Sequence, residues 1–286
     1  MALTVTPLDG GFAGEVAGLD LWSDLDRAAV EAIREAWSTC GVLVFRRQVL
    51  TEDELVAFGA RFGEPVAIVR ADWASQATPE VTYISNLKDA EGRPIGRPGS
   101  GEVAWHTDQS YRAHPATGTF LHAMEVPGDG GNTYFANLLL AYEALPRRLR
   151  DRIAGRRGIF SYARRVTGYE DEKPLPEEVR KETPDVMHGL TQVHPVTGRT
   201  SLYIDPSTVT GIEGLPAEEG RALLDEINAH AVKPEFVYEH RWRIGDLVMW
   251  DNGFLMHRRD PYDAAQWRFL KRTSVALPPE RHIVPG

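Results

Sequence analysis

Three features that would each indicate a particular class of protein are scarce in this 286-residue chain. Cysteine occurs once, at Cys40, so no internal disulfide can form, and the chain suits a reducing compartment. No stretch approaches the roughly 18 consecutive apolar residues of a transmembrane helix. The N-terminal residues also lack the basic segment and the apolar run of a signal peptide. We therefore expect a cytoplasmic protein that does not bind a membrane.

Positive charge is limited too, since 32 Lys and Arg stand against 41 Asp and Glu and give a net charge of −9. Nucleic-acid binding depends on clustered Lys and Arg, so we do not expect a nucleic-acid partner. The hydrophobic content of 42% is ordinary for a globular protein with a large core. Neither a linker nor a repeat divides the chain. We therefore expect one domain spanning residues 1–286.

Short strand-like segments separated by turns account for most of the chain. Their β-branched and aromatic residues alternate or form brief apolar runs, which are typical of strands. We expect strands within residues 3–21, 42–45, 81–85, 103–111, 117–126, 132–136, 186–193, 201–204, 236–241, 247–250 and 269–276. Helices are expected at 26–37 with Ser23 as N-cap, at 51–62 after a Thr51 capping box, at 138–153 and at 216–231. This pattern predicts a mainly β protein with flanking helices and a double-stranded β-helix (jelly-roll) core.

The segment 103–111 carries a histidine and an aspartate two positions apart, His106 and Asp108. Residues i and i+2 of a strand face the same side, so the two side chains would lie together. Such a pair is two-thirds of a 2-His-1-carboxylate triad, which holds non-haem Fe(II). With 9 His and 41 acidic residues among 286, chance alone predicts about one such pair. The motif therefore needs support from elsewhere in the chain.

That support comes from a second histidine, His257, and from Arg268 eleven residues later. His257 can supply the third ligand. The arginine lies in a strand-like run, residues 266–275, and its guanidinium is a natural bidentate anchor for a carboxylate such as the distal end of 2-oxoglutarate.

Together these motifs resemble the taurine dioxygenase (TauD/TfdA) family of Fe(II)/2-oxoglutarate oxygenases. The matching stretches, in order over nearly the whole chain, are Trp105–Asp108, Gly131–Thr133, His194–Arg199, Trp250–Asn252 and the spaced His257, Arg268 and Arg272. One departure is Asp251-Asn252-Gly253, where the family often has Asp-Asn-Arg.

The resemblance implies both the reaction and the residues that carry it. Iron would be held by His106, Asp108 and His257, with O2 as the oxidant. The far carboxylate of 2-oxoglutarate would bind Arg268 and Thr133. The expected outcome is hydroxylation of a C–H bond of a small substrate, with release of succinate and CO2. Halogenation is disfavoured because Asp108 fills the position that chloride would need.

Residues that could bind the substrate are harder to identify. Arg272 should share a face with Arg268 but stand roughly 13 Å from it, with Lys271 turned the other way. A cation facing an apolar interior needs an anionic partner, which is either an anionic substrate or an internal acid such as Glu102 or Asp251. Asn86 either lines the pocket, as in relatives, or caps a turn.

Two irregular stretches, 88–102 and 169–185, could form a wall and a lid of the site, or be surface insertions. We also expect a homo-oligomer. The alternative functions are a cupin-like metal-dependent hydrolase or isomerase without 2-oxoglutarate, and a non-catalytic scaffold. Arg268 and Thr133 argue against the hydrolase or isomerase, since neither reaction needs a dicarboxylate clamp.

Overall fold

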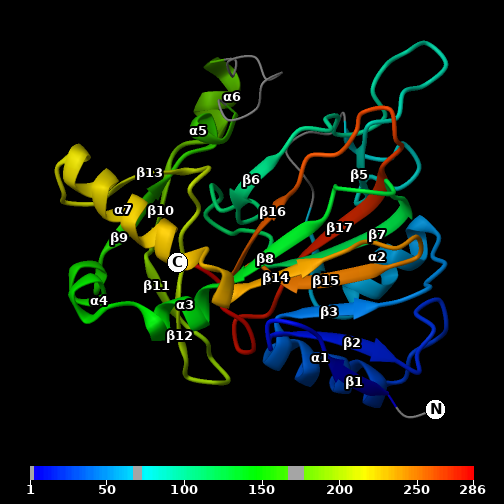
Figure 1. The fold of residues 1–286 in the computed structure, drawn as a ribbon, viewed down its shortest axis with the longest axis horizontal. Helices are drawn as coiled ribbons and strands as arrows, with labels where there is room; N and C mark the ends of the chain where they lie inside the picture. The colour runs from blue at the N-terminus through cyan, green and yellow to red at the C-terminus, as the bar shows by residue number, and fades with distance from the viewer. Residues whose placement is uncertain (1–2, 67–72, 167–176) are drawn as a thin grey trace.

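Two mainly antiparallel sheets face each other and enclose an apolar core (Figure 1). The computed structural model describes residues 3–66, 73–166 and 177–286. The larger sheet follows the order β1 (Thr4–Pro7), β2 (Ala13–Ala17), β3 (Val42–Phe45), β15 (Leu247–Asp251), β7 (Gly118–Glu125), β17 (Phe269–Ala276) and β4 (Glu64–Pro65), with β5 (Thr82–Ser85) also paired to β17. The smaller sheet follows the order β14 (Val237–His240), β8 (Thr133–Asn137), β16 (Leu255–Arg259) and β6 (Val103–His106). This arrangement confirms the jelly-roll core.

Two helices cover the outer face of the larger sheet, α1 (Arg27–Cys40) and α2 (Glu52–Ala60). Trp37 of α1 and Phe58 of α2 meet Phe120 of β7 with ring centroids 5.7 Å apart in each pair. The capping box predicted at Thr51 is present in α2. The predicted cap of α1 was wrong by three residues, because Asp26, not Ser23, accepts the amide of Ala29 at 2.8 Å.

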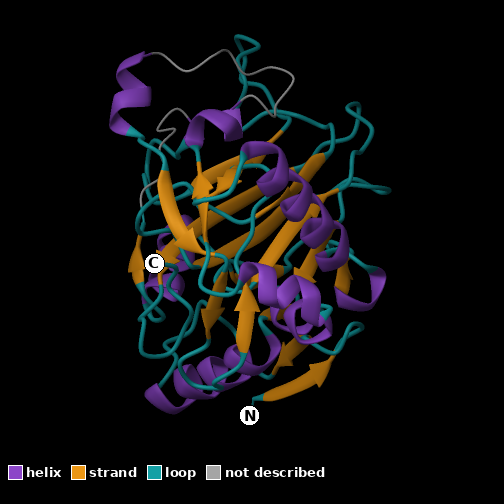
Figure 2. Cartoon of the chain, turned by 90° about the vertical axis from the view of Figure 1, so that its left-hand side faces the viewer, coloured by secondary structure: helices purple, strands orange, loops and turns teal. Residues whose placement is uncertain are grey.

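A second layer lies beside the jelly roll and packs around a core of its own. It contains the sheet β10 (Val186–Gly189), β9 (Arg157–Phe160), β13 (Val209–Ile212), the hairpin β11 (Thr191–Val193) and β12 (Thr200–Leu202), and the helices α3 (Leu138–Ala144), α4 (Arg147–Ile153), α5 (Tyr162–Val166), α6 (Glu177–Glu182), α7 (Ala217–Ala231) and η2 (Pro234–Phe236). In the perpendicular view the strands run through the middle and helices lie outside them (Figure 2). No helix among the described residues is long and apolar enough to span a membrane.

The structure corrects several predicted elements. The helix expected at 138–153 is divided into α3 and α4, because Leu145 takes an extended ψ of 130° before Pro146. The strand expected at 186–193 is two strands, β10 and β11. Strands β9, β13 and β16 were not predicted. The strand expected at 103–111 ends at His106, so Asp108 lies in the turn that follows.

The departure at Gly253 has a packing explanation. A Cβ placed there would lie 2.4 Å from the carbonyl oxygen of Ile283 and 2.9 Å from Oδ1 of Asp251. The C-terminal segment is held at this turn by His282, whose Nδ1 lies 2.8 Å from Oδ2 of Asp251. The space that an arginine would use is therefore filled by the chain's own C-terminal segment.

We predict that Gly253→Ala destabilises the protein by about 1–3 kcal/mol, because the C-terminal segment must shift to admit the methyl group. The free energy of unfolding in urea measures the effect. Gly101→Ala is the matched control, since nothing lies within 4 Å of a Cβ there. Equal stability of the two variants would contradict this packing explanation.

Candidate metal and co-substrate site

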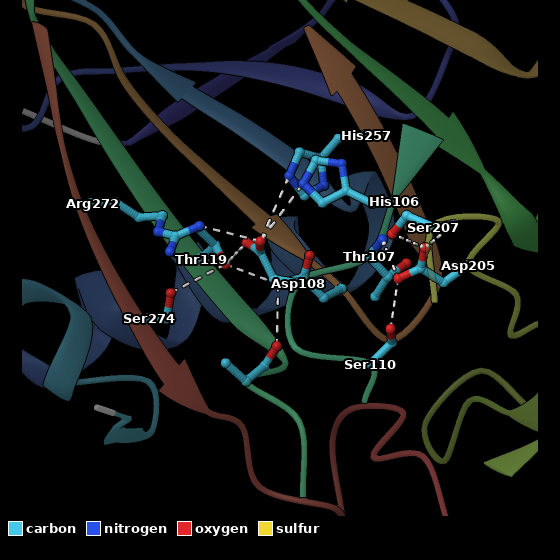
Figure 3. Close-up of polar contacts among 12 residues, drawn as sticks. His106, Thr107, Asp108, Ser110, Thr119, Asp205, Ser207, His257, Arg272 and Ser274 are labelled. Carbon is cyan, nitrogen blue, oxygen red and sulfur yellow. Dashed lines mark hydrogen bonds and ion pairs between the residues drawn. The ribbon is translucent and has the colours of Figure 1, made fainter. Parts of the chain in front are cut away.

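Three candidate ligands converge at the end of β6. His106 on β6 is paired directly with His257 on β16, and their ring centroids lie 4.1 Å apart. Oδ1 of Asp108 lies 3.9 Å from Nε2 of each histidine. The three residues are buried, and their ligand atoms all lie within 4.8 Å of one another. Figure 3 shows both imidazoles and the carboxylate pointing at one position.

The protonation states of the histidines suit metal binding. Nδ1 of His106 lies 2.8 Å from the carbonyl oxygen of Ala104, so Nδ1 carries the proton and Nε2 presents a lone pair. Burial, and then the neighbouring His257, hold the pKa of His106 well below its ordinary value. Burial lowers the pKa of His257 to about 4, despite the opposing charge of Asp108. Both imidazoles are therefore neutral at neutral pH, as ligation requires.

Asp108 is ionised although it is buried. Burial alone would raise its pKa, but Arg272, His257 and the hydrogen bond from Thr119 lower it overall. Nη1 of Arg272 lies 3.2 Å from Oδ1, and the hydroxyl of Thr119 donates to Oδ2 at 2.9 Å. The hydroxyl oxygen of Thr119 in turn accepts a hydrogen bond from the side-chain Nδ2 of Asn252 at 2.9 Å. The carboxylate is thus fixed in position and keeps its charge.

The partner of Arg272 differs from both acids named from the sequence. Glu102 lies 3.7 Å from Arg258, and Asp251 pairs with His282. The internal acid of Arg272 is Asp108, a candidate ligand itself. Lys271 lies on the opposite face of β17, where it pairs with Glu52 of α2 at 3.0 Å.

Arg268 lies in a cradle that suits a ligand carboxylate. Its side chain is 2% exposed, forms no ion pair with any described residue, and leaves Nε without a hydrogen-bond partner. Burial, followed by the nearby Arg259, lowers its pKa to about 9. A Cβ on Gly131 would come within 3.3 Å of Cδ and Nε, so glycine leaves room for this side chain.

Thr133, two residues beyond Gly131, is also buried. Its hydroxyl oxygen accepts the indole N–H of Trp242 at 3.0 Å, which leaves its own hydrogen free to be donated. A hydroxyl donor and a guanidinium without an acid are complementary to a carboxylate.

Asn86 joins the end of β5 to the residues before β17. Its Oδ1 accepts the backbone N–H of Arg268 at 2.9 Å, and its Nδ2 donates to the carbonyl of Gln266 at 2.8 Å. The amide therefore positions the backbone of Arg268. Contact between Asn86 and substrate remains a prediction.

The stretch 88–102 is tied to β16 close to the candidate ligands. The guanidinium of Arg259 donates to the carbonyl of Gly99 at 3.1 Å and also to the carbonyl of Gly101. The hydroxyl of Tyr262 donates to Gly99 at 3.3 Å. These bonds favour a role for this stretch as a wall of the site. Residues 169–176 of the lid predicted at 169–185 lie outside the described residues, which include only its part from residue 177.

Sequence reasoning missed two residues that support the aspartate turn. Thr119 is one of several strand threonines, and nothing in its sequence context distinguishes it. Asp205 lies 97 residues beyond Asp108, directly after the strand expected at 201–204, and nothing in the sequence indicated that this segment contacts the metal turn. Asn252 belonged to a recognised motif, but its bond to Thr119 could not be foreseen.

Two neutral histidines and an ionised aspartate on a jelly roll define the 2-His-1-carboxylate class of non-haem metal centres. The family described as "Taurine catabolism dioxygenase TauD, TfdA family" matches residues 4–274. The chain belongs to this family, and it is an Fe(II)- and 2-oxoglutarate-dependent dioxygenase.

Individual relatives agree with this assignment over nearly their full length. The chain is 35% identical to the alpha-ketoglutarate-dependent 2,4-dichlorophenoxyacetate dioxygenase of Cupriavidus pinatubonensis, covering 96% of this chain and 98% of that protein. It is also 35% identical to pentalenolactone F synthase of Streptomyces arenae, covering 94% of each. The crystal structure of AAD-2 in complex with Mn(II) and N-oxalylglycine is similar with a TM-score of 0.83 and 33% identity, covering 99% of this chain and 100% of that one. The hydrolase, isomerase and scaffold alternatives are not supported.

We predict that His257→Ala leaves the fold intact but weakens Fe(II) binding by more than the roughly 10- to 100-fold typical of changes outside the ligand set. The imidazole is a candidate ligand on a strand that hydrogen bonds on both sides hold in place. Anaerobic calorimetry with Fe(II) or Mn(II) measures the affinity, and circular dichroism checks the fold. His114→Ala, an exposed histidine near the metal turn, is the control. Unchanged affinity in His257→Ala would remove this residue from the ligand set.

Proposed function

We propose that His106, Asp108 and His257 bind Fe(II), that Arg268 and Thr133 bind the distal carboxylate of 2-oxoglutarate, and that the enzyme hydroxylates a small organic anion. O2 is the oxidant: bound Fe(II) would activate it, one oxygen atom would enter succinate as 2-oxoglutarate loses CO2, and the other would enter the hydroxylated product. The chain's own residues orient the co-substrate and keep both histidines neutral. We also propose a cytoplasmic homo-oligomer with a single domain.

The observation that carries the co-substrate assignment is the environment of Arg268. A fully buried guanidinium without an acid partner is costly unless a ligand supplies the anion. The ligand in the similar AAD-2 structure, N-oxalylglycine, has the same two terminal carboxylates as 2-oxoglutarate, with NH in place of one CH2 group. Both facts support a dicarboxylate at this position.

The anionic substrate is supported by the charges around the triad. Arg165 of α5 lowers the pKa of His106, Asp108 and His257, and Arg97 contributes at His106, so positive charge reaches the centre from two further segments. Arg272 offers a third cation, with its Nε unpartnered. The substrate named for one relative, 2,4-dichlorophenoxyacetate, is itself a carboxylate.

The test of this proposal is succinate release from 2-oxoglutarate with Fe(II) and O2, measured against sulfonates, aryloxy acids, amino acids and phosphonates. We expect one anionic class to accelerate succinate formation together with its own hydroxylation. Acceleration by neutral compounds alone would contradict the substrate proposal, and no succinate with any compound would contradict the reaction.

We predict that Arg268→Ala raises the apparent KM for 2-oxoglutarate roughly 30-fold or more, because an unpaired buried carboxylate costs on the order of 2–5 kcal/mol. Thr133→Ala removes one hydrogen bond, about 1 kcal/mol, and should raise it about fivefold. Arg241→Ala is the control, since this side chain is 80% exposed and its ion pair is with Glu239. If Arg268→Ala leaves the KM unchanged, Arg272 becomes the candidate clamp.

We predict that Arg272→Ala lowers substrate-coupled turnover by roughly tenfold or more, since a hydrogen bond to a charged group contributes about 1.5–3 kcal/mol. Its apparent KM for 2-oxoglutarate should stay within about twofold of the wild type. Arg272→Lys, which keeps a cation near Asp108, separates the two contacts. Full coupled activity of the lysine variant would show that Arg272 serves Asp108 alone.

A further inference from the structure

A buried aspartate outside the ligand set, Asp205, accepts hydrogen bonds from the turn that carries Asp108. Asp205 follows β12, and its side chain is fully buried. Oδ2 accepts the backbone N–H of Thr107 at 3.2 Å and the hydroxyl of Ser110 at 2.6 Å. Oδ1 accepts the backbone N–H of Ser207 at 2.9 Å and its hydroxyl at 2.6 Å. Figure 3 shows Asp205 beside this turn, on the side away from Arg272.

Hydrogen bonds alone compensate this buried charge. Asp205 forms no ion pair with any residue that the structure describes, and all four of its bonds come from N–H or O–H groups. A buried carboxylate is stable only while its donors remain in place. The two bonds to Oδ2 therefore act as a directional restraint on Thr107 and Ser110, and the two bonds from Ser207 to Oδ1 hold the carboxylate in place.

The turn itself needs such a restraint. Gln109 has a φ of +55°, a left-handed conformation that costs a residue with a Cβ about 1–2 kcal/mol. Asp108 lies between the two residues that Asp205 holds. A second support comes from His188 of β10, whose Nε2 lies 3.1 Å from the carbonyl oxygen of Ser110. The layer beside the jelly roll thus holds the turn on the side opposite Arg272.

We propose that Asp205 is a positioning residue that sets the geometry of Asp108 for the metal, and that the segment 203–208 thereby couples the second layer to the metal centre. This inference rests on the proposed ligand set. No hydrogen bond or ion pair joins the carboxylate of Asp205 to His106 or His257 among the described residues. Burial lowers the pKa of His257, and the charge of Asp205 is the smallest of the opposing effects on it. Asp205 therefore acts mainly through the backbone and hydroxyl groups on either side of Asp108.

Asn is a sharp probe at this position, because it keeps the shape of aspartate but replaces one acceptor by a donor. Whichever way the amide turns, its NH2 faces the backbone N–H of Thr107 or of Ser207, and neither of these can become an acceptor. One end of the restraint is therefore lost without creating a cavity, and either loss loosens the turn, because Oδ2 holds Thr107 and Ser110 while Oδ1 anchors the carboxylate on Ser207.

The experiment compares Asp205→Asn with wild type in anaerobic Mn(II) titrations at a temperature where circular dichroism shows both folded. We expect metal affinity to fall roughly 10- to 100-fold, as for other residues that orient a ligand. The apparent KM for 2-oxoglutarate at saturating Fe(II) should stay within about twofold, because Arg268 is untouched. Wild-type affinity in the folded variant would overturn the inference.

Asp246→Asn is the matched control, since Asp246 is equally buried but pairs with Arg46 and His240 away from the site. It should lower the melting temperature and leave Mn(II) affinity unchanged. Equal loss of affinity in both variants would overturn the inference, because the effect would then follow stability alone.

A second pair of variants decides the question if Asp205→Asn does not fold. Ser110→Ala and Ser207→Ala each remove one hydroxyl bond to Asp205, at 2.6 Å in both cases, but only Ser110 belongs to the metal turn. We expect weaker Mn(II) binding in Ser110→Ala than in Ser207→Ala, and equal affinities would overturn the inference. A wild-type protein that binds no divalent metal would overturn the proposed function as well.

Discussion

The buried charge of Asp108 is the constraint on which the site depends. Its carboxylate accepts hydrogen bonds from Thr119 of β7 and from Arg272 of β17, and both strands belong to the larger sheet. The two histidines that face it belong to the smaller sheet. The candidate metal position therefore lies where the two sheets meet, and every group around it is held by strand pairing or by a hydrogen bond.

Arg272 and Arg268 have different electrostatic environments. Arg272 stabilises an acid that the chain provides, whereas Arg268 is buried without one. A lowered pKa at Arg268, caused by burial and by Arg259, shows that the cradle disfavours an unaccompanied cation. A dicarboxylate co-substrate bound at Arg268, as proposed, would relieve this cost on binding. The same arrangement predicts strong dependence on the distal carboxylate.

Much of this site could be predicted from the sequence because its signals are local or regularly spaced. His106 and Asp108 stand two residues apart, and Arg268 follows His257 by eleven. The contacts between distant segments could not be foreseen. Nothing in the sequence indicated that Arg272 pairs with Asp108, 164 residues away, or that Asp205 lies against the metal turn.

The predicted fold failed where local patterns compete. Residues 103–111 read as one strand because aromatic and β-branched residues continue past His106, yet the chain turns at Asp108 with Gln109 at positive φ. Strand β16 was missed because Leu255–Arg259 mixes apolar, histidine and arginine residues and shows no alternation. Its burial comes from pairing with β6 and β8, which only the tertiary structure supplies.

The most direct test of this account is a crystal structure of the protein grown anaerobically with Mn(II) and N-oxalylglycine. We predict that Nε2 of His106, Nε2 of His257 and the carboxylate of Asp108 bind the metal, and that the distal carboxylate of the ligand contacts Arg268. A metal bound elsewhere, or a distal carboxylate on Arg272 while Arg268 remains without an anion, would contradict it.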